Sequence, residues 1–282
     1  MGKTCILTDN AAQFTQPAFP GRNLIRILPF NIEIDGRIIG NENFKISHLP
    51  KSIGGNHPPR LIPLEEDKLT QYLLDLGKEY SQILGIFSSP GMLPSNTIFS
   101  SLAEELRGKV EFHFLDSQTI SIGLGLLLQA AGDNLEKDTP FDEVEKIIRS
   151  MVPKVFTLLC APNLSYLCQS GFVDHAQATV GEMLGLLSIF TLEEGILSHS
   201  EKVRTFRQVF DLYLEFLDEF DDFRHIALVQ GTPTHIPETK LLRDHIQNEY
   251  PKAPFTEHNL SLPVATLLGP GASAIFIMES EL

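Results

Sequence analysis

Polar side chains gather where three short apolar segments end, and their types suit the binding of an anion. Asp9 follows the first of these segments, "SSPGMLPSN" at residues 88–96 follows the second, and Asp116 and Ser117 follow the third. Hydroxyl groups and the free backbone amides at a helix start are donors for a carboxylate or a phosphate. Ser95, Asn96 and Thr97 precede a predicted helix, so we expect them to hold such a group, although Ser95 could also serve only as a helix cap.

A glycine pair in "DSQTISIGLGLLLQAAG", residues 116–132, raises a second question. Apolar residues recur at helical spacing from Ile120, yet Gly123 and Gly125 stand in the first turns, where each costs about 1 kcal/mol relative to alanine. Glycine leaves room for a close approach. Either another backbone packs against this helix or a ligand passes over it.

Composition and charge narrow the class of protein. The chain has 282 residues, of which 43% are hydrophobic and 21% charged, as in ordinary globular proteins of two domains. Its formal net charge of -14 would repel nucleic acid and anionic membrane surfaces. We therefore expect neither partner.

Several site classes lack their motifs. The nine histidines are scattered and the three cysteines form no zinc or disulfide framework, so we predict no metal, no cofactor and a reducing, cytoplasmic location. Nucleotide-binding and hydrolase motifs are absent. The apolar stretches are also too short to span a membrane.

The elements that must position these residues alternate between strand and helix. Buried strands are predicted at "TCILTDN", "QILGIFSS" and "VEFHFLDS", each followed by a loop and a helix. This order predicts an α/β fold in which residues 1–152 form a doubly wound parallel sheet, with a hairpin insertion at about 21–57. Residues 153–282 are predicted to form a mixed α/β layer domain, with a ligand cleft between the two lobes. The polar strand ends then fall at the carboxyl edge of the first sheet, where open α/β sheets bind ligands.

The order of these segments resembles the DegV family of bacterial fatty-acid-binding proteins. The match covers essentially the full length and is carried by "LTDN" at residues 7–10, "FNIEIDGRII", Ser95 to Thr97, Asp116, Ser117, Ser121, Gly123 to Gly125, Leu164, Tyr166, Leu167, Gly171, and "GPGA" at residues 269–272. The resemblance implies a two-lobed carrier that holds one long-chain fatty acid between its lobes. It also implies that the carrier presents the carboxylate to a separate ATP-dependent acyl kinase.

The chain departs from the family pattern near the expected head-group site. Its "RLIPL" contains Arg60 where the family has a hydroxyl-rich stretch, Leu267 and Leu268 stand where a histidine is common, and Phe172 replaces an arginine. A carboxylate taken out of water needs donors or a cation. We therefore hypothesise that Arg60 supplies the charge.

These observations predict a non-enzymatic fatty-acid carrier. The residues expected to hold the carboxylate are Ser95, Asn96, Thr97 and Arg60, and those expected around them are Asp9, Ser89, Ser117, Ser121, Gly123, Gly125, Gly269 and Gly271. Two alternatives stay open: a binder of another amphiphile, such as an isoprenoid or a polar lipid, and a small-substrate hydrolase with Asp9 or Asp116 as its general base.

Overall fold

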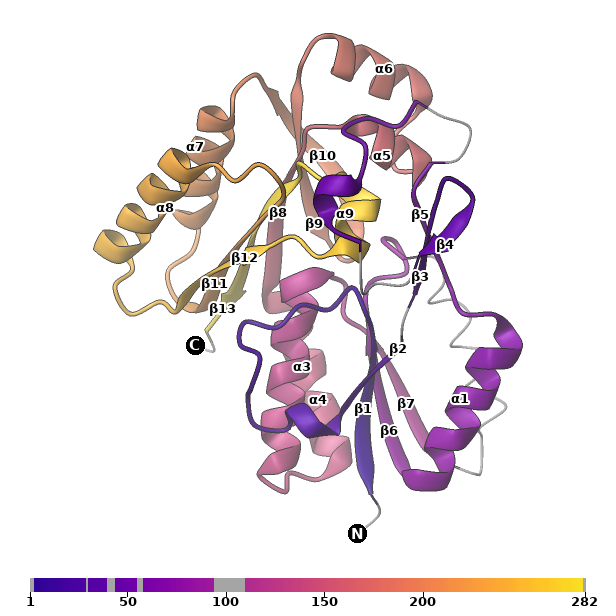
Figure 1. Cartoon of the computed structure of the whole chain (residues 1–282). Helices are drawn as coiled ribbons and strands as arrows, with labels where there is room; N and C mark the ends of the chain where they lie inside the picture. The colour runs from indigo at the N-terminus through magenta and orange to yellow at the C-terminus, as the bar shows by residue number, and fades with distance from the viewer. Residues whose placement is uncertain (1–2, 29, 40–43, 55–57, 94–109, 281–282) are drawn as a thin grey trace. The chain divides into compact units, whose positions relative to one another are not determined.

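A computed structural model describes residues 3–28, 30–39, 44–54, 58–93 and 110–280 (Figure 1). The chain forms two compact units. The first comprises Met1–Phe30, Pro63–Pro153 and Glu194–Ile196, and the second comprises Asn31–Ile62, Lys154–Glu193 and Leu197–Leu282. The chain passes between the units after Phe30, Ile62, Pro153, Glu193 and Ile196. The hairpin insertion expected at about 21–57 of the N-terminal domain is divided: its part up to Phe30 groups with the first unit, and the part from Asn31 groups with the second.

The first unit is built on a parallel sheet whose described strands have the order β2-β1-β6-β7. These strands are β1 Thr4–Asp9, β2 Ile25–Leu28, β6 Gln82–Phe87 and β7 Glu111–Asp116. Its described helices are α1 Glu66–Glu79, α3 Ser121–Glu136 and α4 Phe141–Met151. In Figure 1, α1 lies on one side of this sheet and α3 and α4 on the other. Both faces of the sheet are therefore covered, which explains the continuous apolar runs in its strands.

Alternation along β1 and β6 decides which side chains face α1. Cys5 and Leu7 of β1 share a buried cluster with Leu69, Leu73 and Leu76, which recur at helical spacing on α1. Burial of one leucine side chain contributes about 1.5–3 kcal/mol. The apolar stripe on α1 is therefore sufficient to fix that helix on the sheet.

The loop after β1 lies along α3 and uses the small residues of that helix. A Cβ atom on Gly125 would be 1.7 Å from the carbonyl oxygen of Gln13, and one on Gly21 would be 2.2 Å from that of Gly132. Between these glycines, the side-chain oxygen of Gln129 accepts a hydrogen bond from the Thr15 amide at 3.0 Å. Glycine at position 125 is thus required by backbone packing.

The second unit contains a mixed sheet and a small antiparallel sheet. The order in the mixed sheet is β10-β9-β8-β13-β11-β12, and in the small one β4-β3-β5. The strands are β3 Asn31–Ile34, β4 Arg37–Ile39, β5 Arg60–Ile62, β8 Val155–Ala161, β9 Leu187–Glu193, β10 Ile196–Val203, β11 Phe223–Gln230, β12 Phe255–Asn259 and β13 Ser273–Glu279. The helices are α5 Leu164–Gln169, α6 His175–Met183, α7 Phe206–Leu217, α8 Ile236–Glu249 and α9 Leu262–Leu268.

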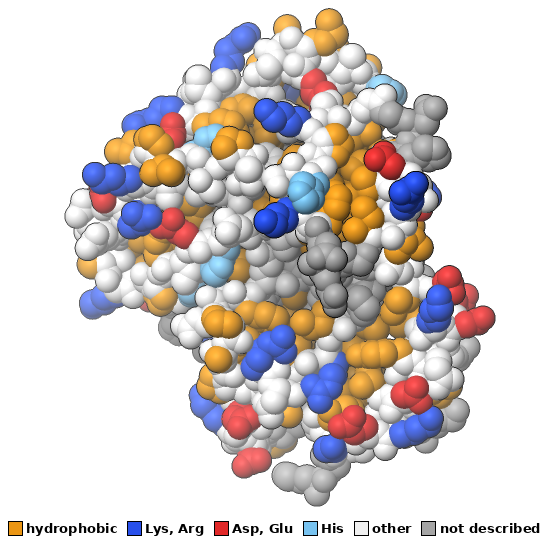
Figure 2. Space-filling view, viewed as in Figure 1, with side chains coloured by type: hydrophobic (Ala, Val, Ile, Leu, Met, Phe, Trp, Pro, Cys, Tyr) orange, Lys and Arg blue, Asp and Glu red, His pale blue; other side chains and the backbone are white. Residues whose placement is uncertain are grey.

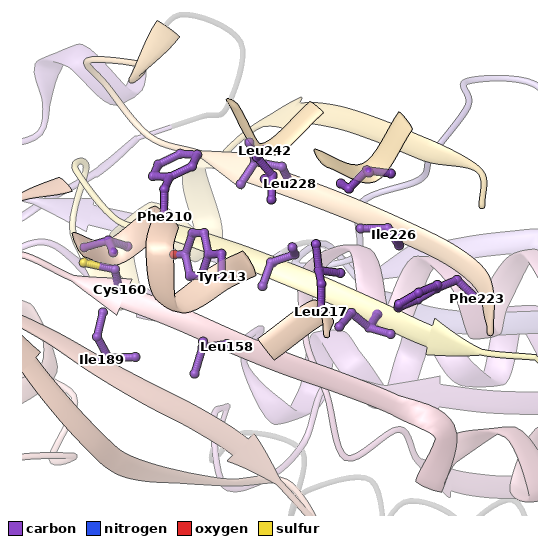
Figure 3. Close-up of a cluster of buried hydrophobic side chains, with 14 residues drawn as sticks. Leu158, Cys160, Ile189, Phe210, Tyr213, Leu217, Phe223, Ile226, Leu228 and Leu242 are labelled. Atoms are coloured by element: carbon purple, nitrogen blue, oxygen red, sulfur yellow. The ribbon is translucent and has the colours of Figure 1, made fainter. Parts of the chain in front are cut away.

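The core of the second unit lies between the mixed sheet and helices α7 and α8 (Figure 3). Phe210, Tyr213 and Leu217 project from α7 toward sheet residues such as Leu158 and Leu228. The Tyr213 hydroxyl, fully buried, forms a hydrogen bond of 2.9 Å with the Ser273 hydroxyl, which satisfies its polar atom inside an apolar core. The aromatic stripe on α7 is therefore core.

The predicted α/β class, with a parallel sheet in one unit and a mixed sheet in the other, is confirmed. In the described parts of the chain, none of the helices has the length and apolar character needed to cross a bilayer. On the face drawn in Figure 2, basic and acidic side chains are interspersed rather than gathered by sign.

Candidate functional site

The carboxyl edge of the parallel sheet brings together polar residues that are far apart in the sequence. Strand β1 has β2 on one side and β6 on the other, so the chain reverses its order of strand addition between β1 and β6. Such a switch point leaves a crevice outside the strand ends, and ligands of open α/β sheets bind there. Asp9 ends β1, Ser88 and Ser89 follow β6, and Asp116 ends β7.

Asp9 is completely buried, and its carboxylate accepts three hydrogen bonds. One oxygen, Oδ2, accepts from the Ser88 amide at 2.8 Å, whereas Oδ1 accepts from the Ser88 hydroxyl at 3.0 Å and from the Ala11 amide at 3.0 Å. Burial raises the pKa of Asp9 above its ordinary value, and these hydrogen bonds oppose the rise. Asp9 therefore fixes the loop after β6 to the end of β1.

The hydroxyls of Ser89 and Ser117 shape the neighbouring loops. Ser89 Oγ donates to the carbonyl of Gly195 at 2.9 Å and accepts from the Gly91 amide at 3.2 Å, while its own amide donates to the Thr119 carbonyl. Ser117 Oγ donates to the Thr119 carbonyl at 3.1 Å. Each hydroxyl proton is thus directed at a backbone carbonyl, which is a structural arrangement and not that of an activated nucleophile.

Asp116 and Ser121 hold the turn that leads into α3. An oxygen of Asp116 accepts from the Gln118 amide at 2.8 Å, and burial raises the pKa of this carboxyl. Ser121 has a left-handed φ of 59° and donates through its hydroxyl to Gln13 Oε1 at 2.8 Å. The predicted residues Ser121, Gly123 and Gly125 are all buried at the start of this helix.

Two buried hydroxyls at the same edge were not singled out from the sequence. Within the described residues, Thr8 Oγ1 and Thr119 Oγ1 have no hydrogen-bond partner. A buried polar atom without a partner costs about 1–3 kcal/mol, so each is a donor to which a ligand could bind favourably. Ser88 was also missed as an Asp9 partner. No local pattern distinguishes these residues from other hydroxyl residues, because their burial and the Asp9 partner of Ser88 depend on segments distant in sequence.

Of the four residues predicted to bind the carboxylate, only Arg60 belongs to the described part of the chain. Ser95, Asn96 and Thr97 lie outside the described residues. Arg60 begins β5 in the second unit and pairs with Glu33, its cross-strand neighbour on β3, at 3.1 Å. Its side chain is 58% exposed, so the pair is a surface ion pair.

Gly269 and Gly271 belong to the second unit, where the chain leaves α9. Gly269 has a φ of 94°, and an added Cβ would be 3.2 Å from the Tyr166 ring, so both conformation and space favour glycine. Tyr166 is buried, and its hydroxyl donates to the Pro50 carbonyl at 2.5 Å. This glycine is therefore explained by packing on Tyr166. An added Cβ at Gly271 would be 3.2 Å from the Pro162 ring.

Comparison with known protein families gives a match over residues 3–280 to the model described as an uncharacterised protein of the DegV family. Among curated relatives, a DegV domain-containing protein of Clostridium acetobutylicum is 27% identical over 226 residues, which is 76% of each chain. Another, from Caldanaerobacter subterraneus subsp. tengcongensis, is 21% identical and covers 99% of this chain and 100% of its own.

Solved structures share the fold. A protein of Streptococcus agalactiae, described as a fatty acid binding DegV family protein, superposes with a TM-score of 0.84 at 22% identity, covering 100% of both chains. The Fatty Acid Kinase (Fak) B3 protein of Streptococcus pneumoniae, loaded with linoleic acid, has a TM-score of 0.80 at 14% identity, covering 99% of this chain and 100% of its own. A Eubacterium eligens DegV family protein loaded with heptadecanoic acid has a TM-score of 0.79 at 15% identity, covering 98% and 100%.

Proposed function

The chain belongs to the DegV family, and we propose from this membership that it binds one long-chain fatty acid and acts as a carrier without catalysis of its own. The observation that carries the proposal is the whole-length match to the family, whose solved members include proteins loaded with linoleic and heptadecanoic acids. The buried polar cluster at the switch point of the parallel sheet supports a ligand with a polar head.

The head group requires donors, and we propose that the carboxyl edge of the first unit supplies them. Asp9 and Ser88 anchor the loop that leads toward Ser95, Asn96 and Thr97, the residues that we propose to donate to the carboxylate. Thr119 adds a buried hydroxyl without a partner among the described residues. Charge-assisted hydrogen bonds from several such donors offset the loss of water around a carboxylate.

The tail supplies most of the binding free energy. Each methylene transferred from water to an apolar wall contributes about 0.8 kcal/mol, so a chain of a dozen methylenes outweighs any single head-group contact. The head-group donors then act mainly on orientation and on the choice between a carboxylate and another polar head.

A carrier must also release its cargo to a further step. We propose that a separate ATP-dependent acyl kinase phosphorylates the carboxylate of the bound acid, as the name of the Streptococcus pneumoniae protein suggests for that relative. In this step a carboxylate oxygen attacks the γ-phosphorus of ATP, and ADP leaves. Acyl phosphate formed only when kinase, ATP and loaded carrier are combined would support this role.

Extraction of the purified protein, followed by mass analysis of the lipid, tests the proposal directly. We expect one fatty acid per chain. A Ser95→Ala variant should bind a fluorescent fatty acid about tenfold more weakly than the wild type. The control is Ser81→Ala, which removes an exposed hydroxyl at the opposite edge of the sheet and should leave the affinity unchanged. If the extracted lipid is an isoprenoid or a polar lipid, the ligand is that amphiphile and not a fatty acid. Turnover of acyl esters by the purified protein would contradict the proposal that it has no catalysis of its own.

A further inference from the structure

The amino edge of the parallel sheet carries a histidine and two carboxylates that have no part in the proposed carrier function. Glu111 and His113 lie on β7, and Asp142 lies in the first turn of α4. One ligand atom from each of the three lies within 4.8 Å of the others. Side chains two apart on a strand share a face, which explains why Glu111 and His113 point the same way. We infer that this cluster is a metal site, although the scattered histidines of the sequence predicted none.

Glu111 is held by a row of polar side chains that crosses three strands. Thr4, Gln82 and Glu111 occupy paired positions on β1, β6 and β7. Thr4 donates to Gln82 Oε1 at 2.9 Å, and Gln82 Nε2 donates to Glu111 Oε2 at 2.6 Å. Because Oε2 is engaged in this way, the remaining oxygen, Oε1, is turned toward His113, 3.8 Å from Nε2.

His113 is oriented from its other side. Its Nδ1 hydrogen-bonds to a carboxylate oxygen of Glu145, which can only accept, so this nitrogen carries the proton. The other oxygen of Glu145 accepts from Arg149 at 2.7 Å, and Phe141 packs against the imidazole at 4.9 Å between ring centroids. Metal-binding histidines are typically oriented by such a carboxylate, which leaves the Nε2 lone pair for the metal.

The ligands are Glu111 Oε1, His113 Nε2 and a carboxylate oxygen of Asp142, and the metal is a divalent transition-metal ion of the zinc class. Mixed imidazole and carboxylate donors suit Zn²⁺ and its neighbours better than Ca²⁺ or Mg²⁺, which prefer oxygen alone. Donors around tetrahedral zinc lie about 3.4 Å apart, so small rotations of the exposed Glu111 and Asp142 side chains close the site. An open cavity of about 600 Å³ adjoins two of these ligands, Glu111 and Asp142, and is also lined by Lys3 and Thr4.

The rival explanation is that His113 serves only to pair with Glu145 and Glu111 and that the cluster has no metal affinity. Calorimetric titration of the full-length protein with Zn²⁺ and absorption titration with Co²⁺ distinguish the two. We expect one tight site per chain and a Co²⁺ spectrum of low coordination number. His113→Gln and Asp142→Asn should each weaken that site by at least tenfold, and Asp142→Asn changes an exposed side chain.

The control is His175→Gln, which changes an exposed histidine whose hydrogen bonds involve Thr179 on the same helix. It should leave the tight site unchanged. Equal affinity in the wild type and in both His113→Gln and Asp142→Asn, or no tight site in the wild type, would overturn the proposal. Asp9 is five residue steps along β1 from Thr4, roughly 17 Å at the usual strand rise, so fatty-acid content measured on the same samples should not change.

Discussion

The carboxylate of Asp9, at the end of β1, accepts hydrogen bonds from both the amide and the hydroxyl of Ser88, which is 79 positions later in the chain. Through this pair, the loop after β6 is attached to the neighbouring strand β1 at the switch point of the strand order. The proposed head-group loop begins immediately beyond it.

Asp9→Asn should destabilise the protein by about 1–3 kcal/mol. In asparagine, an NH2 group that cannot accept a hydrogen bond takes the place of one of the two oxygens. If it stands at Oδ2, the Ser88 amide loses its acceptor, and if it stands at Oδ1, the Ala11 amide and the Ser88 hydroxyl lose theirs. Ser88→Ala removes only the hydroxyl and should cost about 1 kcal/mol. Urea unfolding measures the stability change in both variants. Equal stability of Asp9→Asn and wild type would show that the three hydrogen bonds make no net contribution to stability.

Thr119→Val should weaken fatty-acid binding while leaving the unliganded protein as stable as wild type or more so. The substitution keeps the shape and removes a buried hydroxyl that has no partner within the described residues. Thr157→Val is the matched control, since Thr157 Oγ1 is also buried without such a partner but lies in the second unit. Thermal unfolding and a fluorescent fatty-acid titration give the two readouts. Unchanged affinity in Thr119→Val would remove that hydroxyl from the proposed site.

Gly125→Ala should lower the free energy of unfolding by about 3 kcal/mol or more, which is the upper range for overpacking. The added Cβ would be 1.7 Å from a backbone oxygen of Gln13, which cannot move without displacing the loop on α3. Gly181→Ala is also a helix-interior change, but its Cβ meets the flexible end of Leu164 at 2.6 Å. That variant should stay within about 1 kcal/mol of wild type, because alanine favours the helix. Similar denaturation midpoints for the two variants would contradict the backbone explanation.

Arg60→Ala should lower fatty-acid affinity about two- to fivefold, which is the range expected for one exposed charge. Glu33→Gln should have the opposite effect, because it frees the guanidinium from its present partner. Both effects should shrink in high salt. If neither substitution alters the affinity, Arg60 has no role in head-group binding.

Stability should fall as the pH drops from about 6.5 to about 4, partly because of His225. Burial, with a smaller effect from His258, lowers the pKa of His225 from 6.5 to about 4. In this window the unfolded chain binds a proton that the folded protein excludes, so the free energy of unfolding decreases as pH falls and is unaffected by this group above 6.5. The loss is up to about 2 kcal/mol after allowance for partial exposure.

The matched variant for this pH dependence is His225→Gln, whose amide can keep the hydrogen bond to Thr256, 2.8 Å from His225 Nε2 in the wild type. In guanidinium unfolding, the stability of the variant should fall less than that of the wild type between pH 6.5 and pH 4, so the difference between the two proteins should change across this range. Parallel pH profiles for the two proteins would contradict the assignment.

Local patterns in the sequence were sufficient for the α/β class, the family and the position of the polar strand ends. The apolar run of β1 and the helical spacing of the apolar residues on α7 are patterns within a few residues. The sequence alone therefore predicted a strand buried on both faces for β1 and a helix buried on one face for α7. The motif around Asp116 and Gly125 marked the same edge of the sheet for the same reason.

Only the tertiary structure decided which partners those residues have. Gly125 meets the Gln13 backbone, Asp9 meets Ser88, and Glu111 meets His113 and Asp142 because strand order and helix packing bring them together. Hydrogen bonds and metal ligation act over a few ångströms in space, whereas these partners are separated by up to 112 positions in the chain. Residue type and local spacing carry no information at that range, and the packing of strands and helices within the first unit supplies it.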